Sequence, residues 1–366
     1  MATEFLSTFP QYGGRPVPSY LLDLIEADTN LDIVQLSVTD TSGSDPVTIF
    51  TNTYYPFGGR LTVEGLASVI ESHMRRCGSS VADITLSIGA RSAPPEAVLA
   101  IPVLYCDYVL PYPERLCGFL NTVAARRIHP GSMIALTVLL PDSGTSVHVC
   151  AVGSAPDGSN TSLSADIGDA LAYDGGRTMI FKVDDIVDML LALPETSASA
   201  ISDICYFSVE YAGVSRTFYI VRDPQWMLFG FRNIFNAREF VDIVAHVNEK
   251  TEVSRTLAVA SGHALQYNQS TARTHEVTTA ALPLAEARAF DFLLNSRSVE
   301  LYTAEASCPV LITEHTCEVD NDNESLASVK FTFRFTDGRP HILPPDIAPM
   351  LPSGGIFSQQ FTLPFA

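Results

Sequence analysis

Lysine is almost missing from this chain: Lys182, Lys250 and Lys330 are the only three among 366 residues. The 22 Lys and Arg residues stand against 41 Asp and Glu residues, which gives a formal net charge of −19. No basic run is longer than the arginine pairs at 75–76 and 126–127. Proteins bind a phosphate backbone through clustered basic side chains that release its counterions. We therefore expect no nucleic-acid partner.

Long apolar runs are also missing. No window approaches the ~20 apolar residues of a membrane-spanning helix, and the first residues, Met1 to Glu4, show no basic segment followed by an apolar one. The sequence thus predicts no membrane insertion and no secretion signal. The seven cysteines are odd in number and form no C-x-x-C pair. This pattern is typical of reduced thiols buried in the strands of a protein folded in cytoplasm.

The motifs of common enzyme classes do not occur: there is no G-x-S-x-G elbow, no G-x-G-x-x-G and no P-loop. Asp320, Asp322 and Glu324 resemble part of a calcium loop, but Ser325 and Phe331 stand where an EF-hand needs Gly and Glu. We interpret this segment as a solvated hairpin tip, and whether it binds a cation stays open.

His315 and Cys317 lie two residues apart and share a strand face, yet zinc requires two further ligands, and no second pair has ligand spacing. A packed core strand is the better interpretation. His263 has no nucleophile elbow and no obvious acidic partner beside it. A carboxylate pair for glycoside hydrolysis depends on spacing in three dimensions and stays open. The sequence predicts no enzyme, no cofactor and no metal site.

An internal repeat covers the first two-thirds of the chain. The alternating segment 33–38 resembles 133–138, and 47–50 resembles 147–150, both at an offset of 100 residues. Apolar residues at helical spacing follow in each copy, over 63–74 and 183–193, and strands close both copies. The later elements are offset by about 120 residues, so we place an insertion of about 20 residues in the Gly/Ser/Asp-rich stretch 153–176.

The third region begins near Trp226. The spacing of Phe240, Ile243, Val244 and Val247 predicts a short helix. A further helix is expected over 282–296, where Pro283 occupies the first turn and one face is apolar. Strands are expected over 254–259, 275–279, 309–313 and 329–335, the last two forming a long hairpin. This order leaves open a third, diverged copy of the repeat.

The predicted fold class is mainly β with short helices (β-rich α+β). It comprises tandem antiparallel β-sandwich-like domains, each with one short helix, and extended terminal arms. We assign an N-terminal arm (1–29), a first repeat (30–112), a linker (113–130), a second repeat (131–223), a C-terminal β-rich domain (224–340) and an extended C-terminal arm (341–366).

The C-terminal arm combines Pro and Gly with Phe357, Phe361, Leu363 and Phe365. Proline and glycine disfavour a stable helix, whereas disordered tails normally lack such apolar residues. We therefore expect these four side chains to be buried at a subunit interface, with docking onto the chain's own third domain as the alternative.

Several segments resemble one known group of proteins. They are the helix 282–287, the strands 310–313 and 329–335 with the acidic segment between them, the aromatic C-terminal arm, and the turn Tyr54-Tyr55-Pro56. Together they are similar to tail structural proteins of phages and prophages of Bacteroidetes-type bacteria. The resemblance implies a non-catalytic component of the tail tip, hub or baseplate. Such a protein is made in the bacterial host cytoplasm, resides in the virion tail, and contacts other virion proteins and its own copies, as a homo-oligomeric ring.

A second hypothesis is a carbohydrate- or cell-surface-binding module used in host recognition. Sugar sites stack aromatic rings on exposed loops, and Tyr54, Tyr55, Phe57 and Tyr112 lie beside Gly and Pro. An enzyme whose site forms only in the folded chain is the third.

Overall fold

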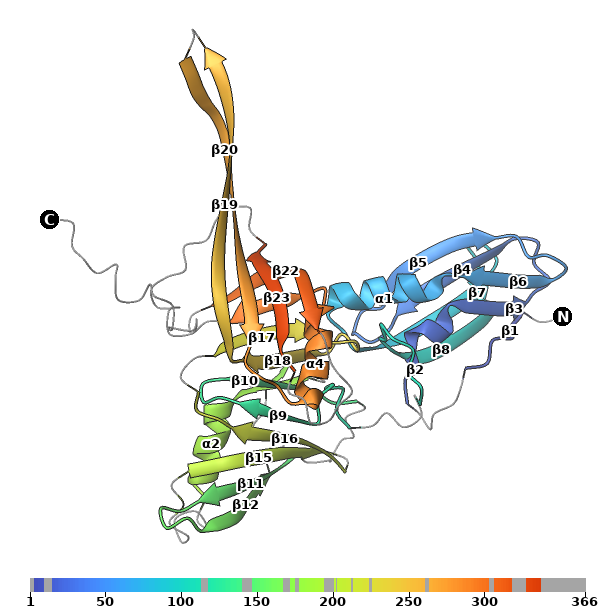
Figure 1. Ribbon diagram of the computed structural model, residues 1–366. Coiled ribbons are helices and arrows are strands. Elements are labelled where there is room, and N and C mark those ends of the chain that lie inside the picture. The colour runs from blue at the N-terminus through green and yellow to red at the C-terminus, as the bar shows by residue number, and fades with distance from the viewer. Residues whose placement is uncertain are drawn as a thin grey trace.

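The computed structural model describes residues 3–9, 15–112, 118–139, 147–166, 172–174, 178–193, 201, 203–211, 213–223, 226–260, 263–302, 306–317 and 327–336. The fold is mainly β with short helices, as the sequence predicted. Figure 1 shows three domains in chain order, and the first and second each meet the third.

The first domain is a sandwich of two sheets with one helix. The larger sheet has the order β2-β8-β7-β4-β5 and the smaller one β1-β3-β6. All neighbours are antiparallel except β2 and β8, which run parallel. The elements are β1 Glu4–Phe5, β2 Val17–Pro18, the 3-10 turn η1 Ser19–Leu22, β3 Leu24–Asp28, β4 Val34–Asp40, β5 Val47–Tyr54, β6 Arg60–Glu64, α1 Leu66–Cys77, β7 Val81–Gly89 and β8 Ala97–Leu104.

Alternation along the strands builds this core. Leu36 on β4 meets Ile25 and Val63 of the smaller sheet in one buried cluster, while intervening residues face outward. Helix α1 follows Gly65 (φ 81°) and ends at Gly78 (φ 68°), left-handed positions that favour glycine.

The second domain has the same topology apart from the third strand of the smaller sheet: β13 pairs with β14, whereas β1 pairs with β3. Its larger sheet has the order β9-β16-β15-β11-β12, again with a parallel first pair, and β10 and β14 pair as β3 and β6 do. The elements are β9 Ala125–Ile128, β10 Met133–Thr137, β11 His148–Ser154, β12 Asn160–Asp166, β13 Ala172–Asp174, β14 Thr178–Lys182, α2 Val183–Leu191, β15 Asp203–Tyr211 and β16 Val214–Ile220.

The sequence prediction of which strands of the first repeat correspond to which strands of the second is wrong by one strand at the beginning of the repeat. We matched 33–38 with 133–138, but β4 corresponds to β11, and β10 corresponds to β3. β4 begins at Val34 and β11 at His148, an offset of 148 − 34 = 114, and helices α1 and α2 are offset by 183 − 66 = 117. The supposed insertion over 153–176 is therefore wrong too, since it contains β12. Short alternating strands resemble one another, so pattern alone does not distinguish neighbours.

Two domain boundaries are also corrected. Residues 1–29 are not simply an arm, because β2 and β3 belong to the two sheets of the first domain and Leu22 and Ile25 lie in its core. Residues 113–130 are not simply a linker, because β9 is an edge strand of the second domain.

The third domain is one antiparallel seven-stranded sheet of order β18-β17-β21-β22-β23-β20-β19. Helix α4 (Leu284–Leu294), within the predicted 282–296, packs Phe290 and Leu293 against it. The strands are β17 Met227–Arg232, β18 Arg238–Ile243, β19 Ala245–Ala260, β20 His263–Thr279, β21 Val299–Tyr302, β22 Ser307–Cys317 and β23 Val329–Phe335. The described residues form no second, smaller sheet here, so the domain is not a third copy of the repeat.

The helix expected around 240–247 is wrong, because the segment forms β18 and the start of β19. Glu239, Phe240 and Ile243 are all buried, since the second domain covers β18. A strand covered on both faces loses its alternation and can mimic helical spacing.

Cysteine placement also departs from expectation. Cys106 is buried, but Cys77, Cys150 and Cys205 are exposed, the last two because their strand neighbours face the core. The acidic tip Asp320–Glu324 and the C-terminal arm with Phe357, Phe361, Leu363 and Phe365 lie outside the described residues.

Candidate functional site at the junction of the three domains

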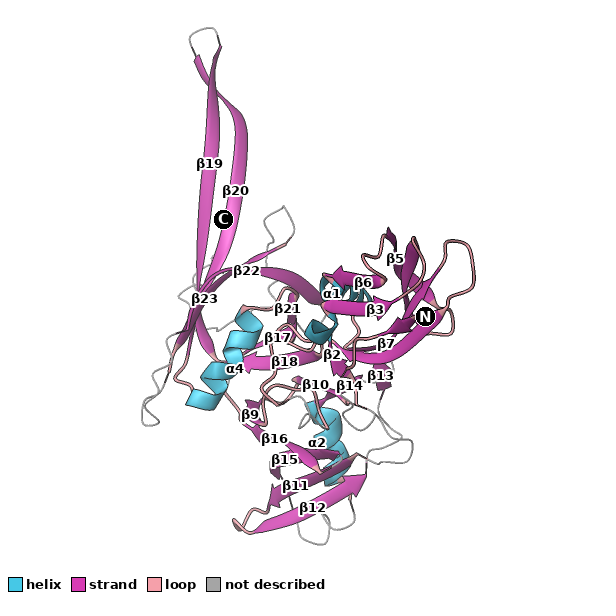
Figure 2. Ribbon diagram, turned by 90° about the vertical axis from the view of Figure 1, so that its right-hand side faces the viewer, coloured by secondary structure: helices cyan, strands magenta, loops and turns pink. Residues whose placement is uncertain are grey.

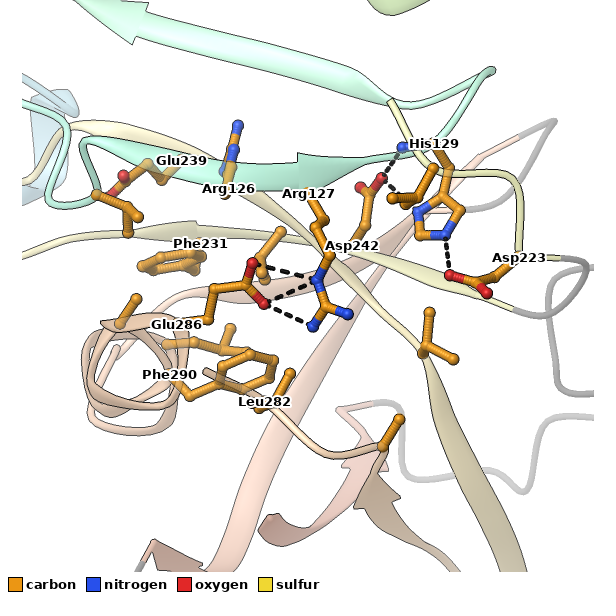
Figure 3. A pocket seen from close by; sticks show the side chains of 17 residues that line it. Arg126, Arg127, His129, Asp223, Phe231, Glu239, Asp242, Leu282, Glu286 and Phe290 are labelled. Atoms are coloured by element: carbon orange, nitrogen blue, oxygen red, sulfur yellow. Dashed lines mark hydrogen bonds and ion pairs between the residues drawn. The ribbon is translucent and has the colours of Figure 1, made fainter. Parts of the chain in front are cut away.

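A small cavity lies between the second and third domains. Its volume is about 40 Å³, and charged side chains from β9, β18 and α4 line it together with apolar ones (Figure 3). Small-molecule sites usually enclose roughly 300–1,000 Å³, whereas a water needs at least about 10–15 Å³. The cavity therefore has room for a few waters.

His129, directly after β9, is at the centre of one cluster. Its Nδ1 lies 3.0 Å from Asp242 Oδ2 and its Nε2 lies 3.4 Å from Asp223 Oδ2. The His129 backbone N–H donates to the same Asp242 oxygen at 2.7 Å, and the Ser132 hydroxyl donates to Oδ1 at 2.5 Å. Trp226 stacks on the imidazole at a centroid distance of 5.0 Å. The His129 and Asp242 side chains are 1% and 3% exposed, so the imidazole is held on both nitrogens and one face.

Two consecutive arginines of β9 reach different parts of the third domain. The Arg126 guanidinium donates to the backbone carbonyl of Phe240 on β18. Arg127 binds Glu286 of α4 with both Nε and Nη2, the latter at 2.7 Å. Burial lowers the pKa of Arg126, and the hydrogen bonds to Glu286 raise the pKa of Arg127. Because neighbours on a strand point to opposite sides, one short strand fixes both β18 and α4.

Glu239 is a buried carboxylate, 2% exposed, that faces the second domain from β18. Its oxygens accept hydrogen bonds from the Thr122 N–H at 3.0 Å, the Thr122 hydroxyl at 2.9 Å and the Asn233 amide at 2.9 Å. Carboxylates are rarely buried unless such donors compensate for lost hydration. These three donors replace the hydration that the Glu239 side chain loses on burial.

The turn between β17 and β18, residues 233–237, joins all three domains. The Asn233 amide donates to Leu120 O of the second domain, and the Asn236 amide donates to Met74 O and Ser79 O of the first. Phe235 and Ala237 lie in one buried cluster whose other members come from the first and second domains: Val81, Leu104, Cys106, Leu120 and Leu139. We call residues 233–237 the junction turn.

A larger, open cleft of about 600 Å³ separates the first and third domains near the junction turn. Four arginines line it at the C-terminal ends of α1 and α4: Arg75, Arg76, Arg232 and Arg297. Arg232 donates to Gly78 O and Asn236 O at 3.0 Å each. Helix C-termini carry partial negative charge, and Arg75 and Arg76 lie in the last turn of α1, where they favour that helix end.

The aromatic residues proposed for sugar binding differ in exposure. Phe57 and Tyr55 are 93% and 75% exposed between β5 and β6, and Tyr112 is 58% exposed at the far end of the domain's chain. Tyr54 is half-buried and packs against the first core. His315 is exposed on β22, so the core-strand interpretation fails for that residue, and His263 is also exposed. The described residues contain no group of three potential metal ligands.

The junction was not predicted from the sequence. Arg126 and Arg127 stand out there only as a basic pair, Glu286 only as an acidic residue near a helix N-terminus, and Glu239 and Asp242 carry no motif. The available signal was a glutamate inside an apolar pattern, as at Glu239 beside Phe240.

No protein-family model matches the chain, and no curated protein matches it. Among solved structures, the chain has a likeness to the ectodomain of a teleost fish polymeric Ig receptor, at 8% identity. The likeness covers 60% of this chain and 97% of that chain, with a TM-score of 0.18, which is too low to support any argument. Among the described residues, no helix is long and apolar enough to cross a membrane.

Proposed function

We propose that the protein is a non-catalytic structural component of a larger assembly, a phage tail tip, hub or baseplate, that acts through protein–protein contacts. One observation carries the proposal: the polar and charged side chains brought together by the fold bind one another across domain boundaries. His129, Arg126, Arg127 and Glu239 all have partners in the interface. A catalytic site would instead direct such groups toward a substrate space.

The junction turn supports the same function. Two sandwich domains fixed to a central sheet by buried hydrogen bonds resist reorientation, because each relative movement exposes unpaired polar groups. A rigid body of this kind suits a building block that must hold its neighbours at set positions. The residue patterns similar to tail proteins supply the identity of the assembly.

The test is to purify tailed particles from a host that carries the coding sequence. We expect peptides of this protein in the particle fraction, and antibody labelling on the tail. A host line with the coding sequence deleted should yield tail-defective particles, rescued by the wild type. Full-length protein that stays outside the particles, with normal tails after deletion, would refute the proposal.

The exposed Phe57 and Tyr55 favour one second candidate, a glycan-binding surface. If it is correct, Phe57→Ala weakens glycan binding at least tenfold, whereas Val98→Ala, at a 58% exposed position on β8, does not. Equal binding by both variants, or no binding by the wild type across a broad glycan panel, would count against it.

A further inference from the structure

The hairpin of β19 and β20 extends far beyond the domain that carries it. Strand β20 pairs with β23 only through residues 275–278. Strands β19 and β20 pair with each other over their whole length, from the pair Ala245 and Thr279 to the pair Ala260 and His263. Figures 1 and 2 show the outer part standing away from all three domains. We call residues 250–274 the hairpin arm. The ten residue steps from Lys250 to Ala260 span about 33 Å at ~3.3 Å per residue.

The arm changes in character along its length. Near its base, Arg273 and Glu249 form a cross-strand ion pair at 3.3 Å, and Lys250 and Glu252, both on β19, form an ion pair at 2.8 Å. From Thr256 to Asn268 the sequence TLAVASGHALQYN contains no Asp, Glu, Lys or Arg. Leu257 in this distal part is 65% exposed. A charged shaft thus carries an uncharged, largely apolar tip.

The arm has no packing partner among the described residues of its own chain. A two-stranded ribbon is marginally stable alone in water. Within the described part of the chain, no strand pairs with the outer edge of β19, or with β20 from Thr274 toward its start at His263. Natural sheets protect such edges with proline, lysine or inward-pointing charge, and residues 256–268 contain none of these. The tip therefore has the properties of a surface that becomes buried in a complex.

Charge identifies the partner. Two bodies of net charge −19 repel each other, and this repulsion decays over a Debye length of about 8 Å at physiological ionic strength. An uncharged tip held about 33 Å out lies several Debye lengths beyond its own body. A tip that binds a basic partner would carry Asp or Glu, and a tip that binds an anionic membrane would carry Lys or Arg. This tip carries none of these residues. An uncharged tip favours contact with another acidic copy of the chain, because it adds no repulsion.

We propose that the tip of the hairpin arm binds a second copy of this chain by adding its strand edges and apolar residues to the neighbour. The proposal rests on the proposed structural function and specifies its self-association element. Backbone hydrogen bonds along the edges supply affinity in this mode of binding, and side chains supply specificity.

Three variants of the full chain test it. Leu257→Glu places a charge on the tip, and Val98→Glu places the same charge at a similarly exposed site on β8. In the third, an Asn-Gly turn joins Glu252 to Ala272, which are paired in the ladder, so the tip is removed. Mass is measured over a concentration series by sedimentation and light scattering, at low and high salt. Thermal unfolding and circular dichroism check that each variant folds.

We expect the wild type and Val98→Glu to self-associate alike, more strongly at high salt because body–body repulsion is screened. Leu257→Glu and the shortened arm should weaken association at least tenfold without lowering the melting temperature. A wild type that stays monomeric at all concentrations overturns the proposal, as does equal association by all four proteins. The proposal is also overturned if the wild type stays monomeric and instead binds anionic vesicles, and if Leu257→Glu abolishes that binding. None of these results decides whether the protein enters tail particles, so the two proposals fail separately.

Discussion

Replacement of Asn236 should show how firmly the first domain is attached. Asn236 is 5% exposed, adopts a left-handed backbone (φ 55°), and donates to Met74 O and Ser79 O at 3.0 Å each. Asn236→Ala removes both donors at about 1 kcal/mol each and adds about 1 kcal/mol for a left-handed alanine. The expected loss is about 3 kcal/mol.

Asn236→Gly is the matched control, because glycine accepts the left-handed conformation while both hydrogen bonds are lost. We expect a loss of about 2 kcal/mol for glycine, so that the difference between the two variants reports backbone strain.

Urea unfolding can locate the effect, because Trp226 is the only tryptophan and lies at the interface of the second and third domains. Its fluorescence follows that interface, whereas circular dichroism follows all strands. In the wild type we expect the two transitions to coincide. In Asn236→Ala the circular dichroism transition should begin at lower urea, as the first domain separates. Coincident transitions and a loss below about 0.5 kcal/mol, the usual range for surface substitutions, would refute the reasoning.

Two other groups give distinct predictions. A double-mutant cycle with Arg127→Met and Glu286→Gln should give a coupling free energy of about 1 kcal/mol or more, because the pair is bidentate and partly buried. The same cycle on the exposed pair Lys250–Glu252 should give a clearly smaller coupling. Burial lowers the pKa of His275 below its ordinary value of 6.5, so the unfolded chain takes up the proton first as pH falls. The contribution of neutral His275 to the free energy of unfolding is therefore complete above pH 6.5 and declines from there toward the folded-state pKa. Urea unfolding between about pH 7.5 and 5.5 should show a flatter decline in stability for His275→Gln than for the wild type. Equal slopes for the two proteins would contradict the assignment.

Local pattern determined much of this fold. Alternation predicted the strands 309–313 and 329–335, and Pro283 followed by an apolar face predicted helix α4 within two residues at each end. These features depend on neighbours in sequence, which period and capping preferences record directly. The two-copy organisation was also visible, because the helices and the later strands recur in order.

Tertiary structure decided which strands are neighbours and which surfaces are covered. β4 and β10 alternate alike, and only pairing shows that one belongs to a five-stranded sheet and the other to a three-stranded one. β18 looked helical because a second domain covers its outer face, and the cluster of Glu239, Asp242 and Glu286 with β9 exists only after domains far apart in sequence have met. The hairpin arm is the converse case: its residues alternate as in any strand, and only the fold leaves the described side chains from Thr251 to Ala258 exposed on both faces. Sequence periodicity reports how a segment is built, whereas burial on each face is set by whatever packs against it.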